Sequence, residues 1–262
     1  MLKLSMNNNI VPCFSSHYSM GKSVINLELP EKIKKGGPRS LFSIAQEHQL
    51  KEVFLVDTSI TGFWEFYENC KKLEILPRFG LKMIACDDID VKDENSLKNQ
   101  HEIIIWLKNS EAYKDIIKIS TLAAVQGFYY QARIDCKNLK KLWTDNLHLA
   151  IPFFDSFIYR NLMTFSSIIP DFGFTKPTLF IEKHDLPFND SIEKGVREYG
   201  VRNDWPIQLV HSILYEKKND FKSYCVFRTM HNRSLFASPN IDHFGTDDFC
   251  WETYKELAQL KD

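Results

Sequence analysis

The 262-residue sequence contains no run of about 18 apolar residues, and its first residues, MLKLSMNNNI, form no apolar segment. The first absence argues against a membrane-spanning helix, and the second argues against a secretory signal peptide. The six cysteines are scattered, with no CxxC pair and no histidine at zinc-finger spacing, so neither a disulfide framework nor a zinc finger is expected. We therefore expect a cytoplasmic protein with reduced thiols.

The sequence also lacks an excess of charge of either sign. Its formal net charge of -1 provides no overall basic field of the kind that drives autonomous nucleic-acid binding. The catalytic signatures GxSxG, HExxH and GxGxxG are missing. One segment, residues 16–23, approaches a phosphate-binding loop, but it has Ser16 where that loop needs its first glycine, and VINLELP follows instead of an amphipathic helix.

What is present is the composition of a packed α/β protein. Hydrophobic residues make up 44% of the chain and include 20 phenylalanines, enough for a full core in one large or two small domains. Segments with helical spacing alternate with short β-rich runs, and this alternation predicts a parallel sheet, either open or closed into a barrel. Residues 86–100 are acidic and polar and are expected to form a surface loop. The predicted strands are residues 10–14, 53–57, 79–85, 102–107, 147–152, 177–182 and 206–211.

The segment at 127–135 reads GFYYQARID and follows a helix-like segment at 106–125. It resembles GFYYKPRID in the PHP domain at the start of the bacterial replicative DNA polymerase III alpha subunit (family C). The resemblance implies a distorted (β/α)7 barrel of parallel strands. It also implies one PHP-like domain over 1–262, with a barrel core at 1–215 and an extension at 216–262 where the polymerase palm would follow. Other matching segments are SSHYSM at 15–20, IEKHDLP at 181–187 and PIQLVHSILY at 206–215.

PHP phosphoesterases hold divalent metals with His, Asp, Glu and Cys side chains at strand ends. Most matching positions have changed here. Cys13 and Ser15 replace the two histidines of the HxH signature, and Thr58 replaces a His. Lys82 replaces an acidic residue, Ser212 replaces an Asp and Leu214 replaces a His. Only Asp57 is retained, and one carboxylate does not hold a di- or trinuclear site. We therefore expect no catalytic residues, no metal and no other cofactor. If the site is active after all, the resemblance implies zinc or manganese as its metal. The vestigial or rearranged ligand candidates are Cys13, Ser15, His17, Asp57 and His211.

Two of these candidates also have a structural interpretation. Asp57 would serve equally as a strand-end residue that caps the following turn. His211, at the end of an apolar strand, has the features of a hydrogen-bonded structural histidine.

The resemblance predicts an accessory or scaffold subunit of DNA replication whose catalytic site has been eroded. Its expected partner is a separately encoded family C polymerase core or a proofreading exonuclease, with nucleic acid contacted only inside that complex and no membrane association. Phe128, Tyr129 and Tyr130 are the interface candidates, unless they pack in the core. A detached domain of this kind would suit a small replicon such as a phage.

Two other functions stay open at this point. One is a divergent metal-dependent phosphoesterase or 3′–5′ exonuclease that uses Cys13, Asp57, His211 and His17 in a rearranged site. The other is a protein that binds a host replication factor and inhibits or redirects it.

Overall fold

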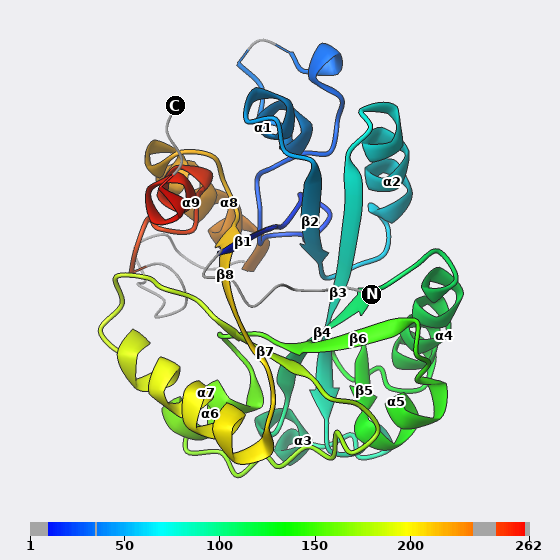
Figure 1. The fold of residues 1–262 in the computed structure, drawn as a ribbon. Coiled ribbons are helices and arrows are strands. Elements are labelled where there is room, and N and C mark those ends of the chain that lie inside the picture. The colour runs from blue at the N-terminus through cyan, green and yellow to red at the C-terminus, as the bar shows by residue number, and fades with distance from the viewer. Residues whose placement is uncertain (1–9, 35, 233–244, 260–262) are drawn as a thin grey trace. The chain divides into compact units, whose positions relative to one another are not determined.

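The computed structural model describes residues 10–34, 36–232 and 245–259, in which strands and helices alternate (Figure 1). The strands are β1 (Val11–Phe14), β2 (Glu52–Asp57), β3 (Leu76–Cys86), β4 (His101–Leu107), β5 (Arg133–Asp135), β6 (Leu147–Ile151), β7 (Thr178–Ile181) and β8 (Ile207–Ile213). The α-helices are α1 (Leu41–Glu47), α2 (Phe63–Lys72), α3 (Glu94–Lys98), α4 (Ala112–Val125), α5 (Cys136–Leu142), α6 (Phe157–Met163), α7 (Asn189–Asn203), α8 (Phe221–Asn232) and α9 (Trp251–Ala258). Two short 3-10 helices are η1 (Pro30–Lys32) and η2 (Lys218–Asp220).

All seven predicted strands are present with small shifts at their ends, whereas the three-residue strand β5 was not predicted. The expectation of a plain loop at 86–100 was wrong in part, because this segment contains α3. The Asp93 carboxylate caps α3 by accepting a hydrogen bond from the backbone N–H of Ser96 at 2.8 Å. A capping aspartate satisfies one of the free N–H groups at a helix start, so a polar segment can still form a short helix.

The sheet has the pairing order β2-β1-β8-β7-β6-β4-β3-β5, and β2 also pairs with β3. Seven strands therefore follow one another in the order of a PHP-type (β/α)7 barrel, and β5 is added beside β3, which confirms the predicted α/β class. The expectation that all strands are parallel was wrong for β4, which pairs antiparallel with both β3 and β6. Hydrophobic periodicity contains no information on strand direction, so the sequence pattern did not reveal this reversal.

The chain divides into two compact units. Among the described residues, unit 1 consists of residues 80–182 and 188–208, and unit 2 of residues 10–34, 36–79, 183–187, 209–232 and 245–259. Strands β3 and β8 each begin in one unit and end in the other. The expectation of one PHP-like domain with a core ending at residue 215 stays a prediction.

Unit 2 contains β1, β2, the start of β3 and the end of β8, with α1 beside β2 and α2 beside the start of β3 (Figure 1). Helix α1 begins after Ser40, whose Oγ accepts a hydrogen bond from the backbone N–H of Phe42 at 3.0 Å. The two helices meet through their apolar faces, where the rings of Phe42 and Phe66 stack with centroids 6.2 Å apart.

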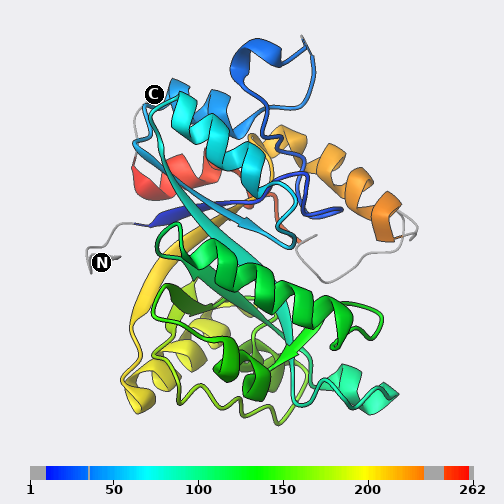
Figure 2. The same ribbon diagram turned by 90° about the vertical axis from the view of Figure 1, so that its right-hand side faces the viewer.

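Unit 1 contains the end of β3, β4 to β7 and the start of β8, with α4 and α5 side by side along it (Figure 2). One face of its sheet is largely apolar and buried, and His101 at the start of β4 is a polar residue on it. The apolar residues of this face include Leu81, Met83, Ile103, Ile105, Leu149 and Leu179. The other face carries polar side chains among apolar ones. Lys82, Glu102, His148 and Thr178 lie on this second face, since side chains alternate between faces along a strand.

The cysteines agree with the expectation of reduced thiols, and the described helices agree with the lack of a long apolar run in the sequence. All six cysteines are free, and five of them are buried. Within residues 10–34, 36–232 and 245–259, no helix combines the length and the apolarity needed to cross a membrane.

Two histidines, the buried His101 and the half-buried His148, make the stability of the protein sensitive to acid. Burial lowers the pKa of His101 to about 4 and that of His148 to about 4, whereas an unfolded histidine titrates near 6.5. The folded state therefore takes up these protons less readily than the unfolded state, so stability is complete above pH 6.5 and falls as the pH drops toward 4. At pH 5 we expect each histidine to have cost roughly 2 kcal/mol relative to pH 7.

Urea unfolding at pH 7 and pH 5 measures this loss. His101→Gln should show about half of the wild-type pH dependence if the two histidines contribute equally. His17→Gln, the same change of residue type at an exposed position, is the matched control. Equal pH dependence in His101→Gln and the wild type would contradict the assignment of part of the acid sensitivity to His101.

Candidate functional site

Asp57, the last residue of β2, is fully buried, and both of its carboxylate oxygens accept hydrogen bonds within unit 2. Oδ1 accepts hydrogen bonds from the Ser16 backbone N–H at 2.8 Å and from the Ser19 hydroxyl at 2.6 Å. Oδ2 accepts one from the Ser16 hydroxyl at 2.6 Å. Burial raises the pKa of Asp57, and the hydrogen bonds from Ser16 and Ser19 oppose that rise.

The segment after β1 is held against β2 and β8 by further serine hydroxyls. Ser15 Oγ donates to the Val56 carbonyl at 2.8 Å, and Ser19 Oγ accepts from the Thr58 backbone N–H at 3.0 Å. Ser23 Oγ lies within hydrogen-bond distance of the Ser15 and Leu214 carbonyl oxygens. No helix begins at Lys22–Ser23, so the near match to a phosphate-binding loop does not form one.

Cys13 and His211 lie on opposite faces of the sheet in unit 2. Cys13 pairs with Phe54 on β2 and with Ser212 on β8, and His211 pairs with Pro12. Neighbouring residues of a strand point to opposite faces, so Cys13 and Ser212 share one face while His211 shares the other with Asp57. Asp57 lies four residues further along the ladder than His211, roughly 13 Å along the strand direction, and two strands away from it.

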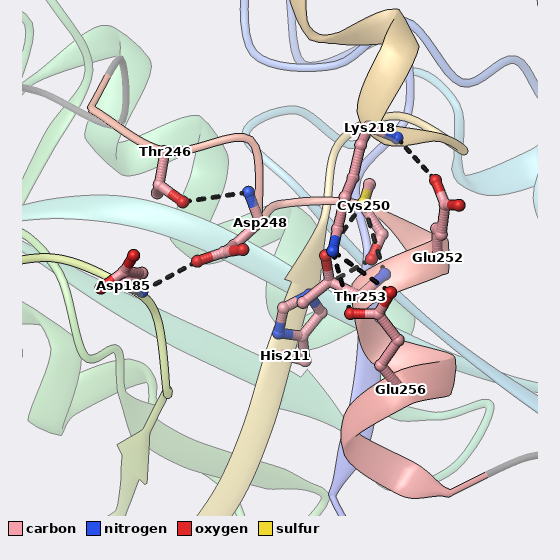
Figure 3. A network of polar contacts seen from close by, with 9 residues as sticks. All are labelled: Asp185, His211, Lys218, Thr246, Asp248, Cys250, Glu252, Thr253 and Glu256. Atoms are coloured by element: carbon pink, nitrogen blue, oxygen red, sulfur yellow. Dashed lines mark hydrogen bonds and ion pairs between the residues drawn. The ribbon is translucent and has the colours of Figure 1, made fainter.

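His211 belongs to the packing of the C-terminal segment on β8 (Figure 3). It is fully buried, and its Nε2 lies 3.3 Å from the Cys250 carbonyl oxygen, which can only accept, so Nε2 carries the proton. Its ring stacks on that of His184 with centroids 5.2 Å apart. Around it, Asp248 accepts from the Asp185 backbone N–H at 2.8 Å, and Lys218 pairs with Glu256 on α9 at 2.9 Å.

His17 and Lys82, the remaining positions of interest, have separate surroundings. His17 is exposed, and its ring lies against that of Tyr18 with centroids 4.3 Å apart. Lys82, on β3 in unit 1, forms an ion pair with Glu102 on β4, with Nζ and Oε2 3.1 Å apart.

The ligand candidates therefore do not fit the zinc or manganese that PHP phosphoesterases bind. The oxygens of Asp57 are already engaged, and Cys13 points away from both Asp57 and His211. Across the described part of the chain, no group of three or more His, Cys, Asp and Glu side chains is placed to hold a metal ion.

The interface candidates form an exposed aromatic turn, which we define as Phe128–Tyr130. Phe128 is 53% exposed and Tyr130 79% exposed, so they are not core residues. The turn is closed by a hydrogen bond from the Tyr129 N–H to the Gln131 carbonyl at 3.0 Å. The guanidinium of Arg133 lies over the Tyr129 ring, 5.1 Å from its centroid.

Arg133 itself is fully buried and was not recognised as important from the sequence. It donates hydrogen bonds to the carbonyl oxygens of Gly127, Ile89 and Val91 and to the Ser96 hydroxyl. An arginine after an aromatic run predicts no such role, because two of its three carbonyl partners, Ile89 and Val91, lie 44 and 42 residues away in the sequence. Ser16 and Ser19 were also missed. Their positions on either side of His17 and Tyr18 are visible in the sequence, but only the position of Asp57 explains why serines stand there.

The comparisons with known proteins agree on one family. Residues 35–164 match the model of the PHP domain. The DNA polymerase III subunit alpha of Borreliella burgdorferi is 20% identical over 231 residues, which cover 84% of this chain and 20% of that protein. That of Chlamydia trachomatis is 33% identical over 94 residues (35% of this chain, 8% of that protein), and that of Aquifex aeolicus 32% over 105 residues (37% and 9%). The chain thus spans a fifth or less of the length of these relatives.

Proposed function

This chain carries a PHP domain related to the N-terminal domain of DNA polymerase III alpha subunits, and we propose that it acts as an accessory subunit of DNA replication. In this role it binds a separately encoded family C polymerase core or a proofreading exonuclease and contributes no hydrolysis of its own. The observation that carries the proposal is the exposed aromatic turn, Phe128–Tyr130, which packs against the buried side chain of Arg133.

An exposed aromatic surface is costly for an isolated protein and typical of an interface. Tyrosine and phenylalanine supply a large contact area with few rotatable bonds, so they lose little conformational entropy on binding. Arg133 holds the backbone of this turn before any partner arrives, which lowers the ordering cost of association further. The surroundings of Asp57 support the proposed absence of hydrolysis, since its carboxylate oxygens already accept hydrogen bonds from Ser16 and Ser19.

The proposal is tested with the full chain, the family C polymerase core and the proofreading exonuclease encoded in the same genome. We expect one of these two proteins to bind the chain directly, and we expect Phe128→Ser with Tyr130→Ser to weaken that binding by at least about tenfold. Phe165→Ser is the matched control, because Phe165 is 90% exposed in a different loop, and its affinity should stay unchanged. Titration calorimetry supplies the dissociation constants.

Three results would count against the proposal. The first is the absence of binding to either protein, and the second is an equal loss of affinity in the Phe165→Ser control. The third is phosphodiester turnover in manganese or zinc that disappears in Asp57→Asn, which would instead support the divergent phosphoesterase. Binding to a host replication factor alone would favour the inhibitor alternative.

A further inference from the structure

The aromatic turn lies beside a strongly charged part of unit 1, the acidic segment, which we define as residues 87–94. One guanidinium joins the two. The Arg133 Nε donates to the carbonyl of Gly127, just before the turn, at 3.0 Å. Its Nη2 donates to the carbonyls of Ile89 and Val91 in the acidic segment, at 3.3 and 3.2 Å. A single planar group that binds both backbones holds the two segments side by side.

Apolar side chains are exposed on both sides of this junction. Val91 of the acidic segment is 44% exposed, Val125 at the end of α4 is 73% exposed, and both flank the aromatic turn. Tyr130 has a φ of 61°, in the left-handed region that bulky residues rarely adopt. Such backbone strain persists only where the surrounding contacts enforce it, and it clusters at binding sites. The exposed apolar surface therefore extends beyond the aromatic turn, and its shape is held in place before any partner binds.

The charged side chains of the acidic segment are nearly all negative. The segment reads DDIDVKDE, with five carboxylates against one lysine, and all six of these side chains are exposed. Within the described residues, none of the five carboxylates forms an ion pair. Those that accept hydrogen bonds are Asp87, Asp88 and Asp93. Carboxylates without a cationic partner in the described structure therefore border the apolar surface.

We propose that the aromatic turn and the acidic segment together bind a basic segment of a partner protein, whose apolar side chains contact the turn while its lysines and arginines face the carboxylates. Carboxylates at the edge of an apolar surface attract cations and repel phosphate. They therefore disfavour nucleic acid, whose bases would otherwise stack on exposed tyrosines. An arginine of the partner can also stack on these rings, as Arg133 does on Tyr129. This inference rests on the proposed function, because it names the chemistry of the partner at that same surface.

The test uses the full-length chain and three labelled synthetic helical peptides of about 18 residues, long enough to present one apolar face. The first peptide carries leucines on one face and lysines and arginines elsewhere. The second has the same leucines with glutamates in place of the basic residues, and the third has the same basic residues with serines in place of the leucines. By fluorescence anisotropy we expect the first to bind at least about tenfold more tightly than either of the others. Its affinity should fall as salt is raised from about 0.05 M to about 0.5 M.

Variants of the chain locate the binding. Asp90→Asn with Glu94→Gln removes two charges whose carboxylates make no hydrogen bond or ion pair within the described residues, so the fold should be unaffected. This pair should weaken the first peptide by about fivefold at low salt and by less at high salt. Asp190→Asn with Glu198→Gln makes the same change at exposed positions of α7 and should leave the affinity unchanged. The double serine variant of the aromatic turn should weaken binding at both salt concentrations, because it removes apolar contact rather than charge.

The proposal is overturned if the first peptide does not bind, if either of the other peptides binds as tightly, or if the two pairs of amide variants lose affinity equally. It is also overturned if oligothymidylate of about 20 nucleotides binds and the double serine variant loses that binding, which would assign the surface to nucleic acid. Self-association of the chain that the same variant abolishes would assign the surface to a second copy.

These outcomes are distinct from a failure of the proposed function. If the polymerase core or the exonuclease binds through the aromatic turn but the basic peptide does not bind, the proposed function stands and the chemistry inferred here is wrong. If the basic peptide binds as expected and neither replication protein does, the proposed function is wrong and the surface still selects a basic, apolar segment.

Discussion

Replacing Asp57 by alanine should lower the free energy of unfolding by about 3 kcal/mol. The substitution leaves the Ser16 backbone N–H and the hydroxyls of Ser16 and Ser19 without their acceptor inside the protein. Hydrogen bonds to a charged group contribute more than neutral ones, and each buried donor left without a partner adds a desolvation cost. Removing the buried charge itself returns part of that loss, because burial disfavours the ionised carboxylate.

Urea unfolding of Asp57→Ala, Asp57→Asn and the double variant Ser16→Ala with Ser19→Ala measures this effect. Asp57→Asn keeps one oxygen acceptor and should lose less than Asp57→Ala. Removing both serine hydroxyls should reduce the further cost of Asp57→Ala, since the two sides of the interaction are coupled. The losses should be identical with and without EDTA. A wild-type midpoint for Asp57→Ala, or a loss that EDTA produces equally in the wild type, would contradict a structural role.

The second large effect is expected at Arg133, where alanine should cost roughly 4 kcal/mol of unfolding free energy. The guanidinium donates to Gly127 O at 3.0 Å, to Ser96 Oγ and Val91 O at 3.2 Å and to Ile89 O at 3.3 Å. A planar group with five donors serves these partners at once, and no other side chain replaces it. Arg133→Lys keeps the positive charge but not the fork of donors, so it should recover only part of the stability.

A local measurement separates this prediction from a general loss of stability. Amide hydrogen exchange at Tyr129, whose N–H bonds to Gln131, should accelerate in Arg133→Lys under conditions where the strands stay protected. Arg197→Ala on α7 is the control, because the Arg197–Glu193 pair lies at the surface and should contribute less than about 1 kcal/mol. Unchanged exchange at Tyr129 would show that the turn does not rest on Arg133.

The elements that the sequence predicted correctly are those whose signal is local. Helix α2 has its apolar residues at i, i+3 and i+4, and the predicted strands are apolar runs bounded by turn residues. Strand β5 was missed because three residues provide no periodicity. The reversed direction of β4 was missed because an antiparallel strand has the same composition as a parallel one.

The site residues were predicted less completely, because their roles depend on which strands become neighbours. The chain pattern placed Asp57 at a strand end but did not reveal that Ser16 and Ser19 face it from the segment after β1. His211 was a reasonable candidate by its position in the sequence, yet strand register places it on the face opposite Cys13. The aromatic turn was predicted as either core or interface, and exposure favours the interface.

The pairing of β1 with β8 also determines the order in which the chain can fold. Val11 pairs with Val210, so the two strands are joined through a loop that includes nearly all of unit 1. Closing so long a loop is entropically expensive, and such distant contacts slow folding. During synthesis, β1 leaves the ribosome long before β8 and can find only β2 as a neighbour. An apolar strand edge therefore stays open to unintended pairing until the last fifth of the chain has been made.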